Sequence, residues 1–518
     1  MIKKLFLRLV FLYSCLSSAQ SDLSIFTKKN RVRLNYMVLK MPYDFNAKDK
    51  KMALGGLHYQ IPITNKFYLG TNTHAALFGD QGGLFTLGIE IGLRQPIFKN
   101  LSLDTNLDFG GGGGYRSLIN KGAYINPNIG LAYQFKNITF GAQYSHFNFY
   151  TGSIKDNSVS LFLEFSTKIQ TALYSEKNNS YDLNNVNKLN NKKSAFAIKL
   201  DQYFPFGRTR KDFEHNSELL RNTLYLLGFE YQKYINQNTF VFIHSDAVYS
   251  GLVAGFMDIF GGIGYEPIQT NHFNIFTKLA IGSAGGRVRA EGGATMYPSL
   301  GIDYHISSKT SLFAHVGYTR ALDGYFEAYT MGGGIKFSTQ PQKVQELTPT
   351  KIYTKGVRVS MQHQTYLDIK RQVREPLDQL HLLALQFNYD LNKSLYLIAQ
   401  TAFAYESRYN GSNFESAKWG AGGYADGMIG MGVYSPIFAK GKIQPFAEVL
   451  IGAGGGAGID AGGGIISKVK VGSYYKLTSH LSLIVSGGKV ISPFANVNSN
   501  NINIGFSVNF STLTTLFK

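Results

Sequence analysis

The stretch FTLGIEIGLRQPIFKNLSLDTNLDFGGGGGYRS, residues 85–117, contains the pattern that decides the fold. Large apolar residues alternate with small or polar residues from Phe85 to Leu93, and again from Leu101 to Phe109. Alternation of this kind places one face of a strand in an apolar environment and the other face in a polar one. The two segments therefore predict a pair of β-strands joined by the short turn FKN, with five glycines, 110–114, at the far end.

The glycine run does not have the sequence of a phosphate-binding loop. Such a loop needs a lysine and a serine or threonine after the glycines and a helix beyond them. Here Tyr115 and Arg116 follow, and the next segment again alternates like a strand. We expect the glycines to form the outer end of a strand in a tight barrel, where they permit bending and close approach of facing strands.

The same unit occurs three times along the chain. PNIGLAYQF (127–135) resembles PSLGIDYHI (298–306) and VKVGSYYKL (469–477), so that Gly130, Gly301 and Gly472 are separated by 171 residues each time. Glycine clusters occupy corresponding places at 110–114, 282–286 and 452–456. Self-similarity at a fixed period indicates one structural unit used repeatedly.

Each unit is expected to contain eight strands. In the first unit these are 31–43, 52–63, 67–79, 84–97, 101–112, 123–135, 138–150 and 158–166. The connections that follow even-numbered strands are short, such as TNK and FKN, whereas those that follow odd-numbered strands include long loops, such as 207–222 and 406–427. Short turns on one side and long loops on the other are typical of outer-membrane β-barrels.

The N-terminus and the composition agree with an exported membrane protein. Residues 1–19 have the basic start, apolar core and small-residue end of a signal peptide. Cys15 is the only cysteine, and whether it is lipidated stays open. No apolar run reaches the roughly 18 residues that a membrane helix needs. The net charge of +19 is interpreted as basic loops facing lipopolysaccharide and other anionic lipid headgroups, with no nucleic-acid partner.

The expected fold class is all-β, a transmembrane outer-membrane β-barrel with three repeats of about eight antiparallel strands. We expect barrel units at 30–166, 194–338 and 356–518, separated by polar linkers at 167–193 and 339–355. Long linkers favour three separate eight-stranded barrels, and one 24-stranded barrel is the alternative. In the first unit Glu90, Arg94, Asp104 and Asp108 face inward and would fill the interior as a charge network.

The units resemble small outer-membrane barrels of the OmpA, OmpW and PagL type, by architecture rather than by close sequence. YSHFNFYTGSIKDNSVSLFLEF (144–165) is similar to the last two strands of lipid A deacylase barrels. The resemblance implies a lipid-facing His146, but the nucleophilic serine of that family is replaced by Asn148, which cannot act as a nucleophile. We therefore interpret Tyr144, His146 and Asn148 as a candidate lipid-interface group without catalytic function.

A second candidate site is an aromatic cluster in the longest outer loop, Tyr409, Phe414, Trp419 and Tyr424, which is a hypothetical surface for a ligand or partner. No sequence motif indicates a metal or a cofactor, so none is expected. The sequence predicts a non-enzymatic integral protein of the cell outer membrane, structural or part of an envelope assembly with other envelope proteins. The alternatives are a transporter or porin with a 24-stranded barrel, and a degenerate lipid A deacylase-like barrel.

Overall fold

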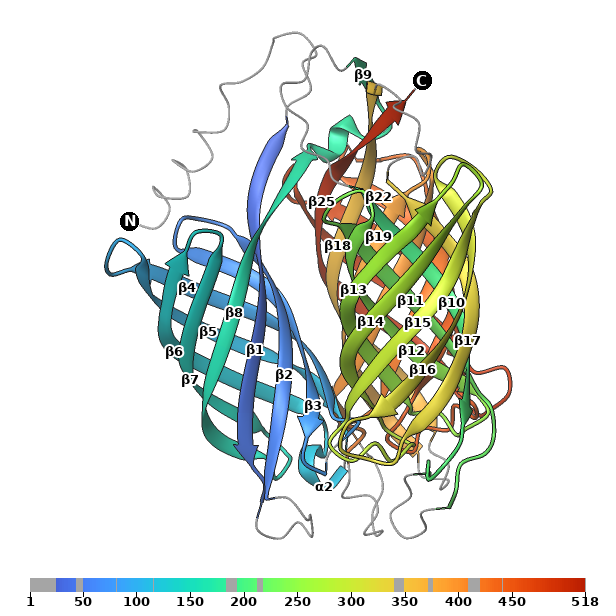
Figure 1. Ribbon diagram of the computed structural model, residues 1–518. Helices are drawn as coiled ribbons and strands as arrows, with labels where there is room; N and C mark the ends of the chain where they lie inside the picture. The colour runs from blue at the N-terminus through green and yellow to red at the C-terminus, as the bar shows by residue number, and fades with distance from the viewer. Residues whose placement is uncertain are drawn as a thin grey trace.

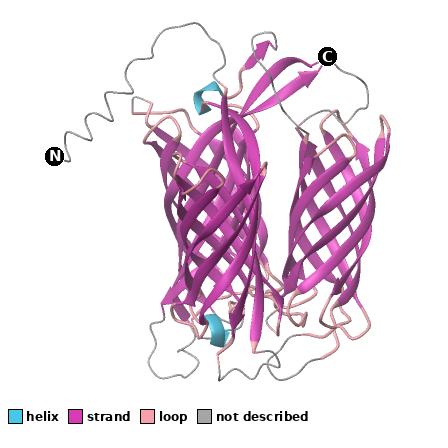
Figure 2. Cartoon of the chain, turned by 60° about the vertical axis from the view of Figure 1, so that its left-hand side comes forward, coloured by secondary structure: helices cyan, strands magenta, loops and turns pink. Residues whose placement is uncertain are grey.

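The computed structural model describes residues 25–42, 50–80, 82–114, 116–182, 193–211, 218–339, 349–370, 376–408, 420–439 and 441–517. Within these residues the chain is almost entirely β-strand (Figures 1 and 2). No helix of the described part is long and apolar enough to cross a membrane. The predicted signal peptide, residues 1–19 with Cys15, lies outside the described residues.

The first eight strands close into a barrel, called barrel 1. Strand β1 pairs on one side with β2, where Arg33 faces His58, and on the other side with β8, where Arg33 faces Glu164. Each other strand pairs antiparallel with its neighbours in the chain. The strands are β1 (Phe26–Lys40), β2 (Lys51–Pro62), β3 (Phe67–Phe78), β4 (Phe85–Pro96), β5 (Leu101–Gly113), β6 (Ala123–Phe135), β7 (Ile138–Phe149) and β8 (Lys155–Ala172).

Eight strands from β10 to β17 close into barrel 2, because β10 pairs with both β11 and β17. The strands are β10 (Ser194–Pro205), β11 (Leu224–Tyr234), β12 (Thr239–Ser250), β13 (Met257–Gln269), β14 (Phe273–Gly285), β15 (Ala294–His305), β16 (Thr310–Ala321) and β17 (Glu327–Ser338).

The last eight strands close into barrel 3 through the pairing of β18 with β19 and β25. The strands are β18 (Pro349–Lys370), β19 (Pro376–Asp390), β20 (Leu395–Arg408), β21 (Ala425–Tyr434), β22 (Ile443–Gly455), β23 (Ile465–Lys476), β24 (Leu481–Ile491) and β25 (Asn498–Phe517). The predicted all-β barrel class is confirmed, and the sheet closes every eight strands, as in the three-barrel form of the prediction.

The two ends of the barrels differ. Short turns such as 63–66 and 97–100 lie at the end where β1 begins and β25 ends, which we call the inner end (Figure 1). Described connections that follow odd-numbered strands of barrel 1, such as 79–84 and 114–122 with the short helix α2 (Arg116–Ile119), lie at the opposite, outer end (Figure 1). In outer-membrane barrels the short turns face the periplasm and the longer loops face outward.

The alternation of the sequence separates the two faces of each barrel. Inward-facing residues are polar and buried along much of each strand, whereas outward-facing residues are apolar. On the outer faces Leu161 of barrel 1 is 59% exposed, Ile281 of barrel 2 is 62% exposed and Val471 of barrel 3 is 62% exposed. Apolar outer faces on closed barrels satisfy the requirements of a lipid environment, in which no strand edge can remain unpaired.

The two segments expected to be polar linkers are partly strand, which corrects that prediction. Strand β8 continues to Ala172, and the turn η1 (Tyr174–Glu176) and strand β9 (Ser180–Asp182) follow it. β9 pairs with β18, and β8 pairs with β25 where Ala172 faces Ser511. Strand β18 also begins at Pro349, inside the expected second linker. Polar composition misled the prediction, because these strand extensions are held by main-chain hydrogen bonds with each other, which do not depend on apolar side chains.

Candidate functional site: three filled barrels around a shared cavity

The interior of barrel 1 is filled by a network of buried ion pairs. The Arg33 guanidinium lies 2.9 Å from the Asp104 carboxylate and 3.1 Å from the Glu164 carboxylate. Arg94 lies 2.7 Å from Glu164 and also pairs with Asp104. Of the expected charge network, Arg94 and Asp104 are paired with each other, together with Arg33 and Glu164, which the sequence analysis did not single out. Glu90 lies beside His58 instead, and Asp108 accepts a hydrogen bond from Asn126.

Barrels 2 and 3 have comparable interiors with different residues. In barrel 2 Lys199 lies 3.1 Å from Asp246, and Lys278 lies 2.6 Å from Glu230. In barrel 3 Lys470 lies 2.7 Å from Glu448. Because an eight-stranded barrel is about wide enough for its own side chains, we expect these pairs to fill the interior of each barrel in the described part of the chain.

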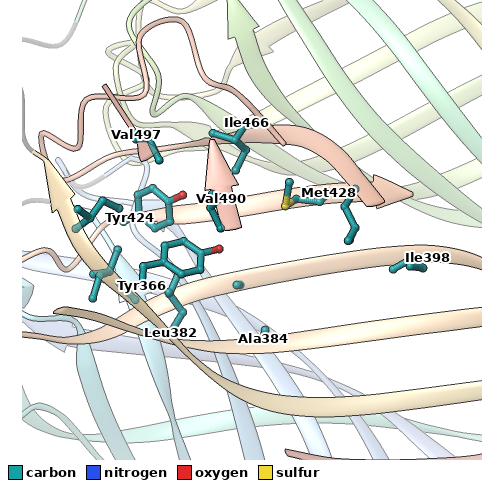
Figure 3. Close-up of a cluster of buried hydrophobic side chains, with 14 of the residues drawn as sticks. Tyr366, Leu382, Ala384, Ile398, Tyr424, Met428, Ile466, Val490 and Val497 are labelled. Atoms are coloured by element: carbon teal, nitrogen blue, oxygen red, sulfur yellow. The ribbon is translucent and has the colours of Figure 1, made fainter. Parts of the chain in front are cut away.

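Apolar side chains close the outer end of each barrel. In barrel 3 the cluster contains Tyr366, Leu382, Tyr424, Ile466 and Val490, all fully buried (Figure 3). The Tyr366 and Tyr424 rings meet edge to face, with centroids 6.2 Å apart. Similar clusters contain, among other residues, Leu220, Val288 and Phe326 in barrel 2, and Met37, Leu118 and Phe149 in barrel 1.

The connection that follows barrel 1 covers the inner mouth of barrel 3. Tyr174 of η1 donates a hydrogen bond to Asp390, and Lys177 lies 2.8 Å from the same carboxylate. The guanidinium of the buried Arg358 lies over the rings of Tyr174, at 4.7 Å, and Tyr474, at 4.0 Å. Barrel 3 is thus closed from the inner side by a segment that the sequence analysis regarded as a linker.

The glycine clusters lie at the outer ends of β5, β14 and β22, the fifth strand of each barrel, as expected. They permit close approach within a barrel, as expected, since a Cβ atom on Gly110 would lie 2.1 Å from the carbonyl oxygen of Leu87 in β4. They also permit close approach between barrels, which was not expected. A Cβ atom on Gly111 would lie 2.5 Å from the carbonyl oxygen of Ala404 in barrel 3. One on Gly285 of barrel 2 would lie 2.3 Å from the backbone nitrogen of Gly83 in barrel 1. Any side chain at these positions would push the barrels apart.

Hydrogen bonds accompany these contacts at each of the three interfaces. The Gly423 N–H of barrel 3 donates to the Gly112 carbonyl of barrel 1, at 3.1 Å. The Ala254 N–H of barrel 2 donates to the Gly462 carbonyl of barrel 3, at 3.0 Å. The Ser283 hydroxyl of barrel 2 donates to the Ala76 carbonyl of barrel 1, at 2.6 Å. The three barrels therefore touch one another in a ring at their outer ends.

A cavity of about 650 Å³ lies between the three barrels, next to this ring of contacts. Its wall is mainly apolar and comes from outward-facing residues of all three barrels, including Leu57, Leu87, Phe229, Ile259, Phe403 and Ile429. Glycines of the contact ring, among them Gly83, Gly114, Gly286 and Gly456, line its outer end. A volume of this size lies within the range of roughly 300–1,000 Å³ that is usual for ligand sites.

The candidate lipid-interface residues share the outer face of β7. Tyr144 is 54% exposed, and His146 and Asn148 follow it on the same face toward the outer end. Nδ1 of His146 is hydrogen-bonded to the side-chain oxygen of Asn157 on β8. The residues form one row, and their contact with lipid stays a prediction.

The aromatic loop cluster is not brought together in the described residues. Tyr409, Phe414 and Trp419 lie outside them. Tyr424 is fully buried inside barrel 3. Residues two apart in a strand face the same side, and Tyr424 is followed at this spacing by Asp426 and Met428 of β21, which face inward. The assignment of Tyr424 to an exposed binding surface is therefore corrected.

A Ser–His–Asn arrangement, which the sequence analysis missed, lies near the inner mouth of barrel 2. Nδ1 of His305 lies 3.0 Å from the Ser311 hydroxyl, and Nε2 lies 3.1 Å from the Asn274 side-chain oxygen. Ser311 is fully buried and faces the filled interior. A nucleophile in that position would have no room for an acyl substrate, so the arrangement contributes to packing rather than to hydrolysis.

No family model matches the chain, and no curated protein matches it. Among solved structures, a de novo designed transmembrane β-barrel is 12% identical, covering 30% of this chain and 94% of its own, with a TM-score of 0.19. The siderophore receptor PirA from Pseudomonas aeruginosa is 10% identical over 95% of this chain and 82% of its own, with a TM-score of 0.27. The FrpB iron transporter from Neisseria meningitidis is 10% identical over 93% and 81%, with a TM-score of 0.27.

At TM-scores this low, none of these structures bears on the arrangement or the activity of this chain. Its own geometry is more informative: closed antiparallel barrels, apolar outer faces, and short turns at one end. These are the features of an outer-membrane β-barrel protein.

Proposed function

We propose that the protein is a non-enzymatic structural component of the cell outer membrane, in which three filled barrels act as one unit. The observation that supports this most strongly is the filling of each barrel. Buried ion pairs such as Arg33–Asp104, Lys278–Glu230 and Lys470–Glu448 occupy the three interiors. Apolar clusters close the outer ends.

The ring of glycine contacts supports the second part of the proposal. Barrels that only shared a chain would be joined by linkers and would not need complementary surfaces. Here each barrel contacts both others through positions where only a glycine fits, as at Gly111, and through hydrogen bonds such as that from Ala254 to Gly462. A fixed three-barrel unit presents a wide apolar perimeter, which suits a scaffold for other envelope proteins.

Lipid is the partner that the surface chemistry favours. The outer faces are apolar over most of the perimeter, and the wall of the central cavity is apolar as well. An apolar cavity facing the membrane interior is filled more favourably by hydrocarbon chains than by water. The basic net charge of +19 favours anionic lipid headgroups such as those of lipopolysaccharide, and nothing favours nucleic acid.

A transporter is the second candidate function, and it would have to use the central cavity. The cavity is large enough for a ligand, and the barrel interiors are not. Transport along this route would require the barrels to separate where they touch at their outer ends, for example where the Gly423 N–H is hydrogen-bonded to the Gly112 carbonyl.

Conductance in planar bilayers distinguishes the two functions. We expect purified protein to give no stable, large conductance at either polarity, with a general porin as the positive control. A parallel lipid extraction of the same sample is expected to recover tightly bound lipid. Steady openings of porin size would overturn the structural proposal and favour the transporter.

A further inference from the structure

Two histidines and an aspartate meet inside barrel 1, away from the ion pairs described above. His58 comes from β2, His74 from β3 and Asp108 from β5. All three side chains are buried, with exposures of 2%, 0% and 0%. Each residue offers one ligand atom, and the three atoms lie within 4.8 Å of one another.

Each of these side chains has one polar atom without a hydrogen-bond partner in the described part of the chain. Nε2 of His58, Nε2 of His74 and Oδ1 of Asp108 are buried and make no hydrogen bond. A buried polar atom without a partner is destabilising by about 1–3 kcal/mol, so one such atom on each of three neighbouring side chains requires an explanation. A cation bound between them would satisfy all three.

The other polar atoms of the same side chains are held by neighbours. Nδ1 of His58 lies 3.0 Å from Oε2 of Glu90, and a carboxylate can only accept a hydrogen bond, so Nδ1 carries the hydrogen. In the neutral imidazole, Nε2 then keeps the lone pair that a metal ion needs. Glu90 in turn accepts a hydrogen bond of 2.9 Å from Gln60. A carboxylate that orients a histidine in this way is typical of zinc sites.

His74 and Asp108 are oriented in the same manner. Nδ1 of His74 lies 3.1 Å from the Thr86 hydroxyl oxygen. The Asn126 amide donates a hydrogen bond of 3.0 Å to Oδ2 of Asp108. Each of the three side chains therefore has one atom fixed by a neighbour and one atom that makes no hydrogen bond to the residues that the structure describes.

We propose that barrel 1 binds one divalent transition-metal ion, zinc being the best fit, through His58, His74 and Asp108. Two imidazole nitrogens and one carboxylate oxygen are ligands that zinc accepts, and a water molecule would complete the tetrahedron. The ion would tie β2 and β3 to β5 across the interior and so stabilise the barrel.

A related cluster in barrel 2 provides an internal comparison. His244, Asp246 and Asp258 also lie close together. There, however, the Lys199 ammonium lies 3.1 Å from Asp246, and the Tyr203 hydroxyl donates to Asp258 at 2.8 Å. A cation already neutralises this cluster and would repel a metal ion. We therefore expect one ion per chain rather than two.

Metal analysis of the full-length protein tests the proposal. Protein refolded with zinc, and then washed free of loose ions, is expected to retain about one zinc per chain by mass spectrometry of the metal. Asp108→Asn and His74→Gln are each expected to reduce retention to background. His244→Gln, the matched change in barrel 2, is expected to retain the ion.

Folding is checked separately by the shift in gel mobility on boiling, so that loss of metal is distinguished from loss of structure. Cobalt substitution provides an independent readout, because tetrahedral cobalt absorbs visible light only when it is bound. Glu90→Gln is expected to weaken zinc binding about 10–100-fold, the usual effect of removing an orienting carboxylate. Folded wild-type protein that retains no zinc or cobalt would overturn the proposal, and so would retention by Asp108→Asn together with loss in His244→Gln.

Discussion

Replacing Gly111 with alanine should loosen the contact between barrels 1 and 3. The new Cβ atom would lie 2.5 Å from the carbonyl oxygen and 2.9 Å from the carbonyl carbon of Ala404. Both are main-chain atoms of β20, which is hydrogen-bonded to strands on both sides and cannot move by itself. Overpacking of this kind is destabilising by about 1–3 kcal/mol, which corresponds to a change of about 5–150-fold in the equilibrium between closed and separated barrels.

Gly427→Ala is the matched control. Gly427 lies in β21 and lines the same central cavity, but a Cβ atom there meets nothing within 4 Å. Both substitutions restrict the unfolded chain to a similar extent, about 0.4–1 kcal/mol, so this contribution cancels in the comparison. The difference between the two variants therefore reports the steric contact alone.

Spin labels at the outer ends of the two barrels measure the separation. Cysteines replacing Lys50 in barrel 1 and Phe494 in barrel 3 would carry the labels, and both positions are exposed. We expect Gly111→Ala to add a population at longer distance and Gly427→Ala to match the parent protein. Identical distance distributions for all three proteins would refute the idea that the glycines hold the barrels together.

Two further predictions concern charge. Arg33→Met should lower the free energy of unfolding by about 3–5 kcal/mol, because Asp104 and Glu164 lose a buried partner. The control Lys168→Met, at an exposed position, should change the free energy of unfolding by less than about 0.5 kcal/mol. A urea midpoint for Arg33→Met equal to that of the parent protein would contradict this prediction. Partial burial in the outer β16–β17 turn raises the pKa of Asp323 to about 6, and the charges of Glu291 and Asp80 contribute less. A carboxyl group with a raised pKa stabilises the folded protein in its protonated form. This stabilisation is complete below about pH 4 and is lost as the pH rises through 6. Asp323→Asn should therefore raise the thermal midpoint at pH 8 and leave it unchanged at pH 4, and an equal effect at both values would exclude this explanation.

Much of the candidate metal site could have been anticipated from strand parity but not from a motif. His58, His74 and Asp108 all have the inward parity of their strands, and Glu90 was already assigned to the interior. Metal motifs in sequence depend on ligands that lie close together along one element. Here the ligands come from three strands, and only closure of the barrel brings them together.

The sequence by itself determined the features that depend on neighbouring residues. Alternation along segments such as 85–97 is enough to define a strand with one apolar face, and turn length is enough to distinguish the two ends of the barrels. The inward charges of Glu90, Arg94, Asp104 and Asp108 follow from the same parity. These properties depend only on residues that are close together in the sequence, so they can be predicted from the sequence alone.

Tertiary structure alone decided which surfaces meet. The place of the glycine run at the end of β5 was predictable, but its contact with Ala404 of barrel 3 was not, because nothing along the chain records the side-by-side packing of two closed barrels. Tyr424 was assigned to a surface loop, although its parity points it into barrel 3 beside Tyr366. The polar segment after β8 was expected to be a linker, yet Tyr174 covers the mouth of barrel 3 over Arg358. Each of these contacts joins residues distant in sequence, and its free energy depends on shape and desolvation that exist only after the barrels have closed and packed.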